Sequence, residues 1–276
     1  MTDTVGTLLA AAAGRAPRSD ARRVLAHLLK TTKERLIMHP ELEVAPEVKA
    51  AYLEALEKIS RGCPVAYVTG VREFYGRPFA VTPDVLVPRP DTETLVEEAI
   101  ALIKHEGAKI VLDLGTGSGI IAVTLALEAP ETTVTATDES PAALAVARGN
   151  AQRLGARVSF FEGSWFDALA QEGAPQSFNL IVSNPPYIDP ADSHMAALSF
   201  EPRGALTDEV DGLQDLRAII ERAPQHLAAG GVLLLEHGYD QGEAVRAMLS
   251  AAGFEDVRTV QDLAGNDRVS GGRRRP

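Results

Sequence analysis

The sequence predicts an α/β protein: a parallel sheet with helices on both faces, preceded by a small helical domain and a β-hairpin. Three observations support this class. Residues 3–60 repeat apolar side chains at helical spacing, and residues 67–81 are rich in aromatic and β-branched side chains. From residue 91 onward, short apolar runs alternate with stretches of helical periodicity.

These changes in pattern predict three parts. Residues 1–65 form a helical domain, residues 66–88 a hairpin that links two domains, and residues 89–276 the α/β domain. In the first part, apolar residues recur at spacings of three and four, as on one face of a helix, around residues 8–12, 24–29 and 52–56. In the second part, we expect strands at Tyr67–Phe74 and Arg77–Val81, on either side of Gly76.

The α/β domain is predicted to hold five strands separated by helices of 10 to 15 residues. The strands are expected at 110–114, 134–137, 158–161, 180–183 and 232–235. Near-continuous apolar strands of this kind are typical of parallel sheets that are buried on both faces. Ligands of such sheets bind beyond the carboxyl ends of the strands. The C-terminal Gly271–Arg275 is expected to be a solvated end.

Composition narrows the function classes. The chain has 45% apolar and 24% charged residues, no apolar run that approaches the roughly 18 residues of a membrane span, and no secretory pattern at its N-terminus. Its one cysteine, Cys63, forms no internal disulfide, and we expect a cytoplasmic protein.

The net charge of −11 opposes nucleic-acid binding and favours a protein substrate. No His or carboxylate grouping has metal-ligand spacing, so we expect no metal.

A glycine-rich loop follows the first expected strand of the α/β domain. It consists of Gly115, Thr116, Gly117, Ser118 and Gly119. Glycines permit positive φ and let backbone N–H groups approach a ligand closely. Asp138 follows about 20 residues later, where a carboxylate can accept hydrogen bonds from both ribose hydroxyls. The dinucleotide fingerprint Gly-x-Gly-x-x-Gly is not met, because Ile120 stands at its last position. The loop instead resembles the first motif of class I methyltransferases that use S-adenosylmethionine, which implies their Rossmann-like sheet.

The fourth expected strand ends in a second motif: Asn184, Pro185, Pro186 and Tyr187. Two prolines make this stretch stiff and leave its carbonyls free to accept hydrogen bonds. An amide nitrogen is a poor nucleophile, because its lone pair is delocalised. Asn184 and the Pro185 carbonyl can each accept one N–H of a target NH₂ group, and so stabilise the charged nitrogen of the transition state. Tyr187 can stack on the planar group. The motif therefore predicts methylation of an amino or amide nitrogen.

Further segments identify the kind of methyltransferase. They are Phe74–Phe79, Val85–Glu93, Asp113–Gly119, Ile181–Ile188, Phe200–Pro202 with Ala205–Leu206, Leu235–Gly238 and Asp262–Arg268. Together they resemble protein-(glutamine-N5) methyltransferases of the HemK/PrmC type. The resemblance covers the chain from about Arg61 to its end. It implies that the substrate is a class I peptide chain release factor, whose Gly-Gly-Gln glutamine enters at Asn184–Tyr187 and whose body contacts the helical domain.

The same resemblance implies the cofactor contacts: Gly115 to Gly119, Asp138, Trp165 beside the adenine, and Asn184. Many relatives have an acidic residue where this chain has Ser164, and a hydroxyl accepts the adenine hydrogen bond more weakly. Arg89 and Glu93 are equally well explained by a structural ion pair or by a cofactor contact. His237, at the end of an apolar strand, is better explained by a structural role than by catalysis.

Three alternatives remain open from the sequence. A sister family methylates glutamine in a ribosomal protein, although its Pro-Arg-Ser-Pro differs from the segment here, which runs from Pro88 to Asp91. An RNA or DNA amino methyltransferase would need a basic face. A binding module that keeps the cofactor site without turnover is disfavoured by the intact motif at Asn184–Tyr187.

Overall fold

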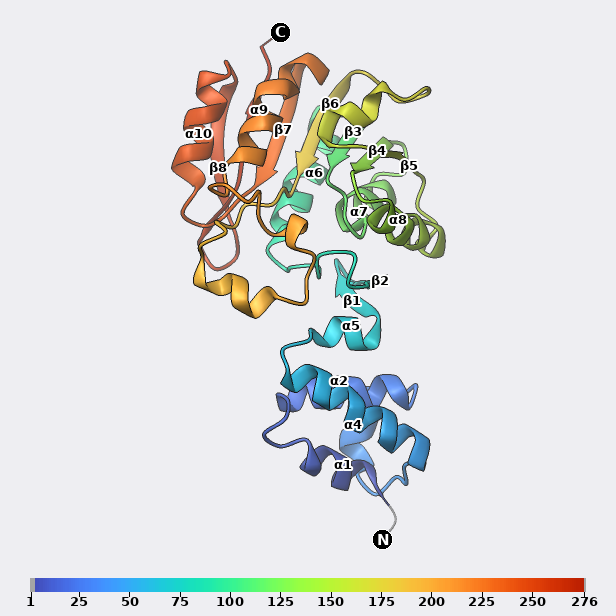
Figure 1. Ribbon diagram of the computed structural model, residues 1–276. Helices are drawn as coiled ribbons and strands as arrows, with labels where there is room; N and C mark the ends of the chain where they lie inside the picture. The colour runs from blue at the N-terminus through green and yellow to red at the C-terminus, as the bar shows by residue number, and fades with distance from the viewer. Residues whose placement is uncertain (1–2, 276) are drawn as a thin grey trace. The chain divides into compact units, whose positions relative to one another are not determined.

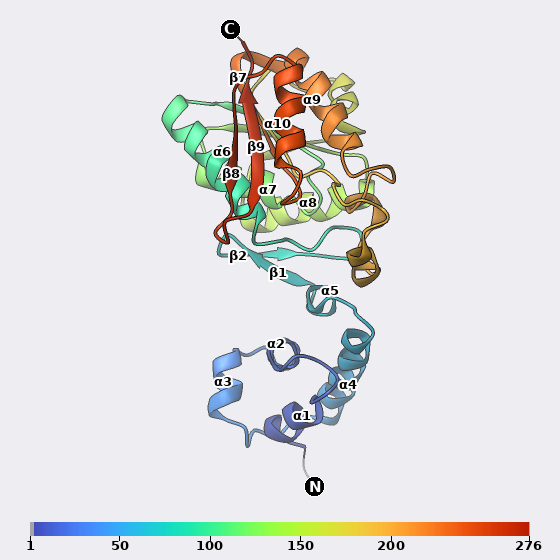
Figure 2. The same ribbon diagram turned by 90° about the vertical axis from the view of Figure 1, so that its left-hand side faces the viewer.

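A computed structural model describes residues 3–275, which form two compact units (Figures 1 and 2). The first unit runs to Val71 and includes the short segment Ala197–Phe200. The second unit consists of Arg72–Ala196 and the chain from Glu201 onward. None of the described helices has both the length and the apolar character that crossing a membrane requires.

The first unit is helical, as expected. Its helices are α1 (Val5–Ala11), α2 (Arg18–Leu28), α3 (Lys33–Met38), α4 (Pro46–Ser60) and α5 (Val65–Thr69). Apolar side chains from the first four helices form its core, and Leu25, Tyr52 and Leu56 are fully buried. The three helices that the apolar spacing predicts are confirmed as α1, α2 and α4. The short helices α3 and α5 have too few turns to show a periodic pattern.

The expected strand Tyr67–Phe74 is wrong in its first half. Val65–Thr69 forms α5 instead, which follows Pro64 and ends at Gly70 in the left-handed conformation (φ 70°). Proline before the first turn and glycine after the last one are ordinary limits of a helix, and here they override the β-branched composition between them. The hairpin itself is shorter: β1 (Val71–Phe74) pairs with β2 (Arg77–Ala80).

The second unit holds a seven-stranded sheet of the class I methyltransferase type. Its strands are β3 (Ile110–Leu114), β4 (Thr133–Asp138), β5 (Val158–Glu162), β6 (Phe178–Ser183), β7 (Leu227–Glu236), β8 (Glu255–Gln261) and β9 (Asp267–Arg273). Their order across the sheet is β5-β4-β3-β6-β7-β9-β8. The first five are parallel, and all five strand predictions are confirmed.

Helices cover both faces of this sheet (Figures 1 and 2). One face packs against α6 (Thr92–Glu106), α7 (Ile120–Glu128) and α8 (Pro141–Leu154), and the other packs against α9 (Gln214–His226) and α10 (Gly242–Ala251). Successive strand residues serve opposite faces, so Val111 joins the first core and Leu112 the second. Both faces are therefore buried, as the near-continuous apolar strands predict.

The expectation of a solvated C-terminal end is wrong. Strand β9 lies between β7 and β8 and is antiparallel to both. Gly271 and Gly272 are buried there, and a Cβ at Gly271 would lie 2.5 Å from the carbonyl oxygen of Leu233. Glycine at this position permits close packing against β7, a role that the local polar composition does not reveal.

Candidate active site

A cavity of about 300 Å³ lies beyond the carboxyl ends of the parallel strands. Leu114 at the end of β3 pairs in register with Ser183 at the end of β6, so the segments that follow these strands begin side by side. Eight residues of the predicted site line the cavity: Gly115, Thr116, Gly117, Ser118, Asp138, Trp165, Asn184 and Pro186. Among the described residues, the lining does not include the predicted Gly119, Pro185 or Tyr187.

The glycine loop depends on left-handed backbone. Gly115, Gly117 and Gly119 have φ of 69°, 55° and 83°, a region that costs little free energy for glycine alone. A Cβ at Gly119 would lie 3.1 Å from the Cβ of Ala147, so this glycine lets α7 begin close to α8. It therefore shapes the loop from outside the cavity. The N–H of Thr116 donates to the carbonyl of Thr137 at 2.9 Å and joins the loop to β4.

Asp113, in β3, holds the glycine loop in place through its side chain. Its side chain is fully buried, and Oδ2 accepts from the Thr116 hydroxyl at 2.7 Å and from the Ala122 N–H at 3.2 Å. Burial raises the pKa of this carboxyl to about 7, against the effect of both hydrogen bonds. Asp113 thus connects the loop to the first turn of α7.

Asp138, at the end of β4, faces the cavity. Its Oδ2 accepts from the Gly117 N–H at 2.8 Å and its Oδ1 from the Ser140 N–H at 2.9 Å. Burial raises the pKa of Asp138, and the two backbone donors oppose that shift. Each carboxylate oxygen has a second lone pair. Two fixed acceptors therefore remain for a pair of neighbouring hydroxyls.

Trp165 forms another part of the cavity wall. It begins the 3-10 helix η1 (Trp165–Ala170) at φ 43°, which is unusual for a residue with a bulky side chain. Its indole lies close enough to the carboxylate of Asp215, at the start of α9, to favour the charged form of that group, and Asp215 itself lines the cavity. Burial raises the pKa of Asp215. The sequence contains no motif that identifies Asp215, because only the fold brings α9 beside the chain after β5.

Asn184 lines the cavity, and only the nitrogen of its side-chain amide has a hydrogen-bond partner among the described residues. Its Nδ2 donates to the Thr92 hydroxyl at 3.3 Å, and in the described chain no donor hydrogen-bonds to its Oδ1. Pro185 is buried behind it, and none of the described residues donates a hydrogen bond to the Pro185 carbonyl. The stretch thus carries two unused oxygen acceptors on a backbone stiffened by prolines.

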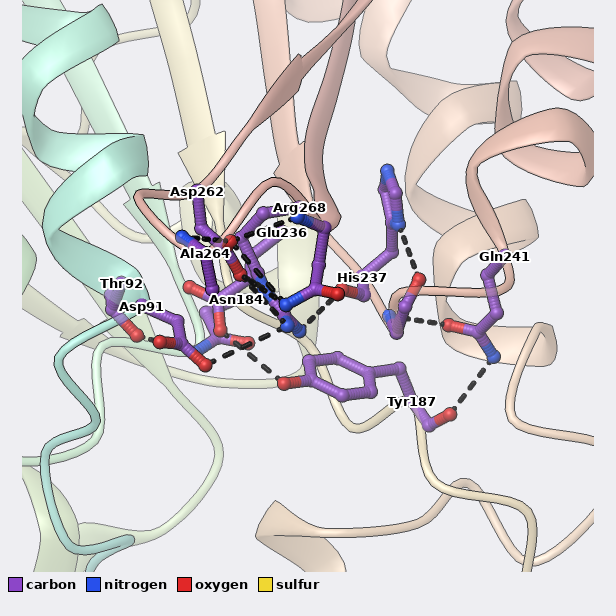
Figure 3. A network of polar contacts seen from close by, with 12 residues as sticks. Asp91, Thr92, Asn184, Tyr187, Glu236, His237, Gln241, Asp262, Ala264 and Arg268 are labelled. Atoms are coloured by element: carbon purple, nitrogen blue, oxygen red, sulfur yellow. Dashed lines mark hydrogen bonds and ion pairs between the residues drawn. The ribbon is translucent and has the colours of Figure 1, made fainter.

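Tyr187 does not line the cavity, so its ring is not placed to stack on the planar group of a substrate there. Its hydroxyl donates to Glu236 at 3.3 Å, and its carbonyl accepts from Gln241 at 3.0 Å (Figure 3). The ring packs against the core on the α9 side of the sheet. Burial raises the pKa of Tyr187. In this structure its contacts position the chain after Pro186.

Arg89 and Glu93 have structural partners. Arg89 pairs with Glu201 at 2.6 Å, and the second oxygen of Glu201 accepts from the Val87 N–H at 2.9 Å. Glu93 accepts from the Tyr75 N–H at 3.0 Å. Arg89 also lines the cavity, so this residue both pairs with Glu201 and contributes to the cavity wall.

His237 is confirmed as structural. It is fully buried, with Nδ1 2.8 Å from the Gly238 carbonyl and Nε2 2.7 Å from the Ser270 hydroxyl. Since a carbonyl can only accept, Nδ1 carries the proton and Nε2 accepts from Ser270. Burial lowers the pKa of His237, which keeps the ring neutral and leaves it no free nitrogen for proton transfer.

The charged residues that line the cavity are mostly acidic. Among its described lining residues, Asp84, Asp138, Glu139 and Asp215 are carboxylates, whereas Arg89 is the one basic residue. Arg89 is already paired with Glu201. This field attracts a cationic ligand and repels a phosphate. It therefore suits a sulfonium nucleoside with a free ribose better than a dinucleotide.

Comparison with known proteins gives matches over most of the chain. The methyltransferase small domain family matches residues 92–200, and the PrmC N-terminal domain family matches residues 5–70. The chain is 52% identical over 258 residues to the release factor glutamine methyltransferase of Bordetella pertussis, which covers 93% of this chain and 94% of that protein. It is 48% identical over 259 residues to the release factor glutamine methyltransferase of Neisseria gonorrhoeae, with 93% of each covered.

The fold has counterparts among solved structures. A methyltransferase from Pyrococcus furiosus matches with a TM-score of 0.54 at 19% identity, over 84% of this chain and 100% of that one. At this identity the likeness is one of fold.

Proposed function

Because this chain belongs to the release factor glutamine methyltransferase family, we propose that it methylates the side-chain amide nitrogen of the glutamine in the Gly-Gly-Gln motif of class I peptide chain release factors. S-adenosylmethionine is the proposed methyl donor. The observation that carries the proposal is Asn184: its Nδ2 is held by Thr92 and its Oδ1 is unused at the edge of the cavity. Translation termination is cytoplasmic, so the proposal also places the protein there.

The residues of the cavity fit this cofactor. Asp138 offers two fixed oxygens to the ribose hydroxyls, and Trp165 offers a planar wall to the adenine. The acidic lining complements a sulfonium and an amino group. Gly115, Thr116, Gly117, Ser118 and Gly119 form the loop that we assign to the same ligand, with Gly119 acting through the shape of the loop. When bound, S-adenosylmethionine supplies an electrophilic methyl group.

The protein's own contribution is to hold the target nitrogen. Asn184 Oδ1 and the Pro185 carbonyl each accept one N–H of the glutamine amide, and we assign both as catalytic. Positive charge develops on that nitrogen during transfer, so two fixed oxygen dipoles stabilise the transition state more than the ground state. Alignment within a rigid stretch adds a proximity contribution of several kcal/mol. The methylated nitrogen is acidic enough to lose its proton to water.

Substrate recognition is assigned to two regions. Asn184, Pro185, Pro186 and Tyr187 receive the glutamine, and Tyr187 keeps Pro186 at the cavity wall through its contacts with Glu236 and Gln241. We assign the helical domain, residues 1–65, to binding the body of the release factor, and residues 66–88 to the link between the domains. The net charge of −11 makes a direct nucleic-acid substrate unfavourable.

A transfer assay tests the proposal. The purified protein is incubated with methyl-labelled S-adenosylmethionine and, separately, a release factor, the same factor with its Gly-Gly-Gln glutamine replaced by asparagine, a ribosomal protein fraction and RNA. We expect label in the unmodified release factor alone, located to the glutamine by mass spectrometry. Label confined to ribosomal protein or RNA would refute the proposed substrate.

A further inference from the structure

Glu236 is a buried carboxylate beside the two unused acceptors. It ends β7, where the parallel register pairs Leu235 with Ser183 and so brings Glu236 level with Asn184. The side chain is fully buried, with Oε1 3.3 Å from the Tyr187 hydroxyl (Figure 3). Its Oε2 is buried without a hydrogen-bond partner among the described residues. An unsatisfied buried carboxylate is costly, so its retention here calls for a reason.

Thr92 connects this carboxylate to Asn184. The Thr92 hydroxyl accepts from Asn184 Nδ2 at 3.3 Å, and it lies close enough to Glu236 to favour the charged form of that carboxyl. Thr92 is 1% exposed, so water does not compete for its proton. A hydroxyl has one proton to donate. Because its oxygen already accepts from Asn184, that proton is free to turn to Glu236.

The direction of this chain of hydrogen bonds sets what Asn184 presents to the cavity. With a carboxylate at Glu236, Thr92 donates to Glu236 and must accept from Asn184, so the Asn184 amide turns Nδ2 toward Thr92 and Oδ1 outward. With a neutral group at Glu236, Thr92 is free to donate to Oδ1 instead. The Asn184 amide then turns over and presents NH₂ to an incoming NH₂ group. The NH₂ group of Asn184 would then face the NH₂ group of the target amide, and Asn184 Oδ1 would no longer accept its hydrogen bond.

We propose that Glu236 is a positioning residue, which acts through Thr92 to keep the Asn184 oxygen facing the target amide, and that its protonation releases this orientation. The proposal rests on the proposed function, because it gives Asn184 the acceptor role. It adds a residue that does not itself line the cavity or touch the reacting atoms.

The surroundings of Glu236 make its charge sensitive to pH. Burial raises its pKa to about 7, against the hydrogen bonds from Thr92 and Tyr187 and the positive charge of Arg268, while Asp91 adds to the rise. Arg268, on β9, shares its charge with Asp262 at 3.3 Å and Asp91 at 3.6 Å. The other titratable neighbour, His237, makes its hydrogen bonds to Gly238 and Ser270. The ionised, active form therefore dominates above about pH 7 and is lost as the pH falls.

The test combines turnover with a signal from Asn184 itself. Methyl transfer to release factor is measured from pH 6 to pH 9 for the wild type, Glu236→Gln, Thr92→Val and Thr92→Ser. In parallel, the side-chain NH₂ resonances of Asn184, assigned by their loss in Asn184→Asp, are followed over the same pH range in the cofactor-free protein.

We expect kcat of the wild type to fall below about pH 7. Glu236→Gln, which imitates the neutral acid, should lower kcat about tenfold or more at pH 8, remove that acid limb, and leave KM for the cofactor within about twofold. Thr92→Val should lose activity to a similar extent, and Thr92→Ser, which keeps the hydroxyl, should restore most of it. The Asn184 resonances should shift with a midpoint near pH 7 in the wild type and not in Glu236→Gln.

Two results would overturn the inference: a Glu236→Gln enzyme with the turnover and pH profile of the wild type, or Thr92→Ser as impaired as Thr92→Val. Asn184 resonances that do not respond to pH between 6 and 9 would also contradict it. The proposed function fails separately, when the wild type itself transfers no methyl group to release factor at any pH. The resonance measurement needs no turnover, so it still decides the inference in that case.

Discussion

The indole of Trp165 lies against the backbone of Gly115: a Cβ at Gly115 would be 3.1 Å from Cζ3 of the ring. These residues follow different strands, β5 and β3, and both line the cavity. The contact leaves room for glycine alone, which also adopts φ 69° here at little cost.

Gly115→Ala should therefore weaken cofactor binding. The added methyl group pushes the indole away and is strained at positive φ, for a combined cost of about 1–3 kcal/mol. We expect the dissociation constant for S-adenosylhomocysteine, measured by calorimetry, to rise about tenfold or more. Gly149→Ala is the control, since a Cβ there meets nothing within 4 Å. Wild-type affinity in Gly115→Ala would argue against cofactor binding beside Trp165.

Trp165 also offers a direct optical test of the site. It is the one tryptophan of the sequence, and it lines the cavity beside Asp215. Titration with S-adenosylhomocysteine should change the intrinsic tryptophan fluorescence with the same dissociation constant that calorimetry gives. Asp215→Ala removes a carboxylate close to the indole, so it should alter the starting spectrum and weaken binding several-fold. Binding by calorimetry with unchanged fluorescence would mean that the ligand lies elsewhere.

Asn184→Ala removes one of the two proposed acceptors. We expect turnover to fall at least about tenfold, while cofactor affinity changes comparatively little, because the lost interaction belongs mainly to the transition state. Gln152→Ala, on the exposed side of α8, is a matched loss of a side-chain amide and should keep wild-type kinetics. Single-turnover rates with release factor measure the effect. An Asn184→Ala enzyme as fast as the wild type would exclude Asn184 from the mechanism.

Glu236→Gln should affect stability with a definite sign. The pKa of Glu236 is raised from 4.5 to about 7 in the folded protein, so between these pH values the folded state binds more protons than the unfolded state. Its contribution to stability therefore falls as pH rises through this range, by roughly 3 kcal/mol in all. The unfolding free energy of Glu236→Gln, relative to wild type, should increase from pH 5 to pH 8. A difference that stays constant with pH would mean that folding does not raise the pKa of Glu236.

Gly271→Ala tests the packing of the last strand. A Cβ at Gly271 would meet the Leu233 carbonyl at 2.5 Å and Cδ2 of Leu234 at 2.6 Å, and backbone cannot move aside at small cost. We expect a loss of stability of about 1–3 kcal/mol in denaturant unfolding. The same substitution at Gly149, in the exposed middle of α8, should raise stability by roughly 0.5–1 kcal/mol. Equal effects at both positions would contradict the tight packing of β9.

Much of the α/β unit could be predicted from the sequence. The five parallel strands have apolar runs long enough to be recognised, and the glycine loop and Asn184–Tyr187 directly follow two of them. Strands β8 and β9 could not be found in this way. Most of their residues are polar or glycine, and they become strands because β7 offers an unpaired edge and Phe254 and Val257 pack against the sheet.

The sequence by itself determined the order of parallel strands and helices along the chain, because the spacing of apolar residues within each segment indicates its secondary structure. It also determined which motifs lie at the carboxyl ends of those strands, because each motif directly follows its strand in the sequence. The tertiary structure decided which side chains act together across large separations: Trp165 with Gly115 and Asp215, Arg89 with Glu201, and Asn184 with Thr92 and Glu236. The physical reason is that register and burial, which set the neighbours and the charge of a side chain, belong to the packed sheet and are not encoded in any one segment.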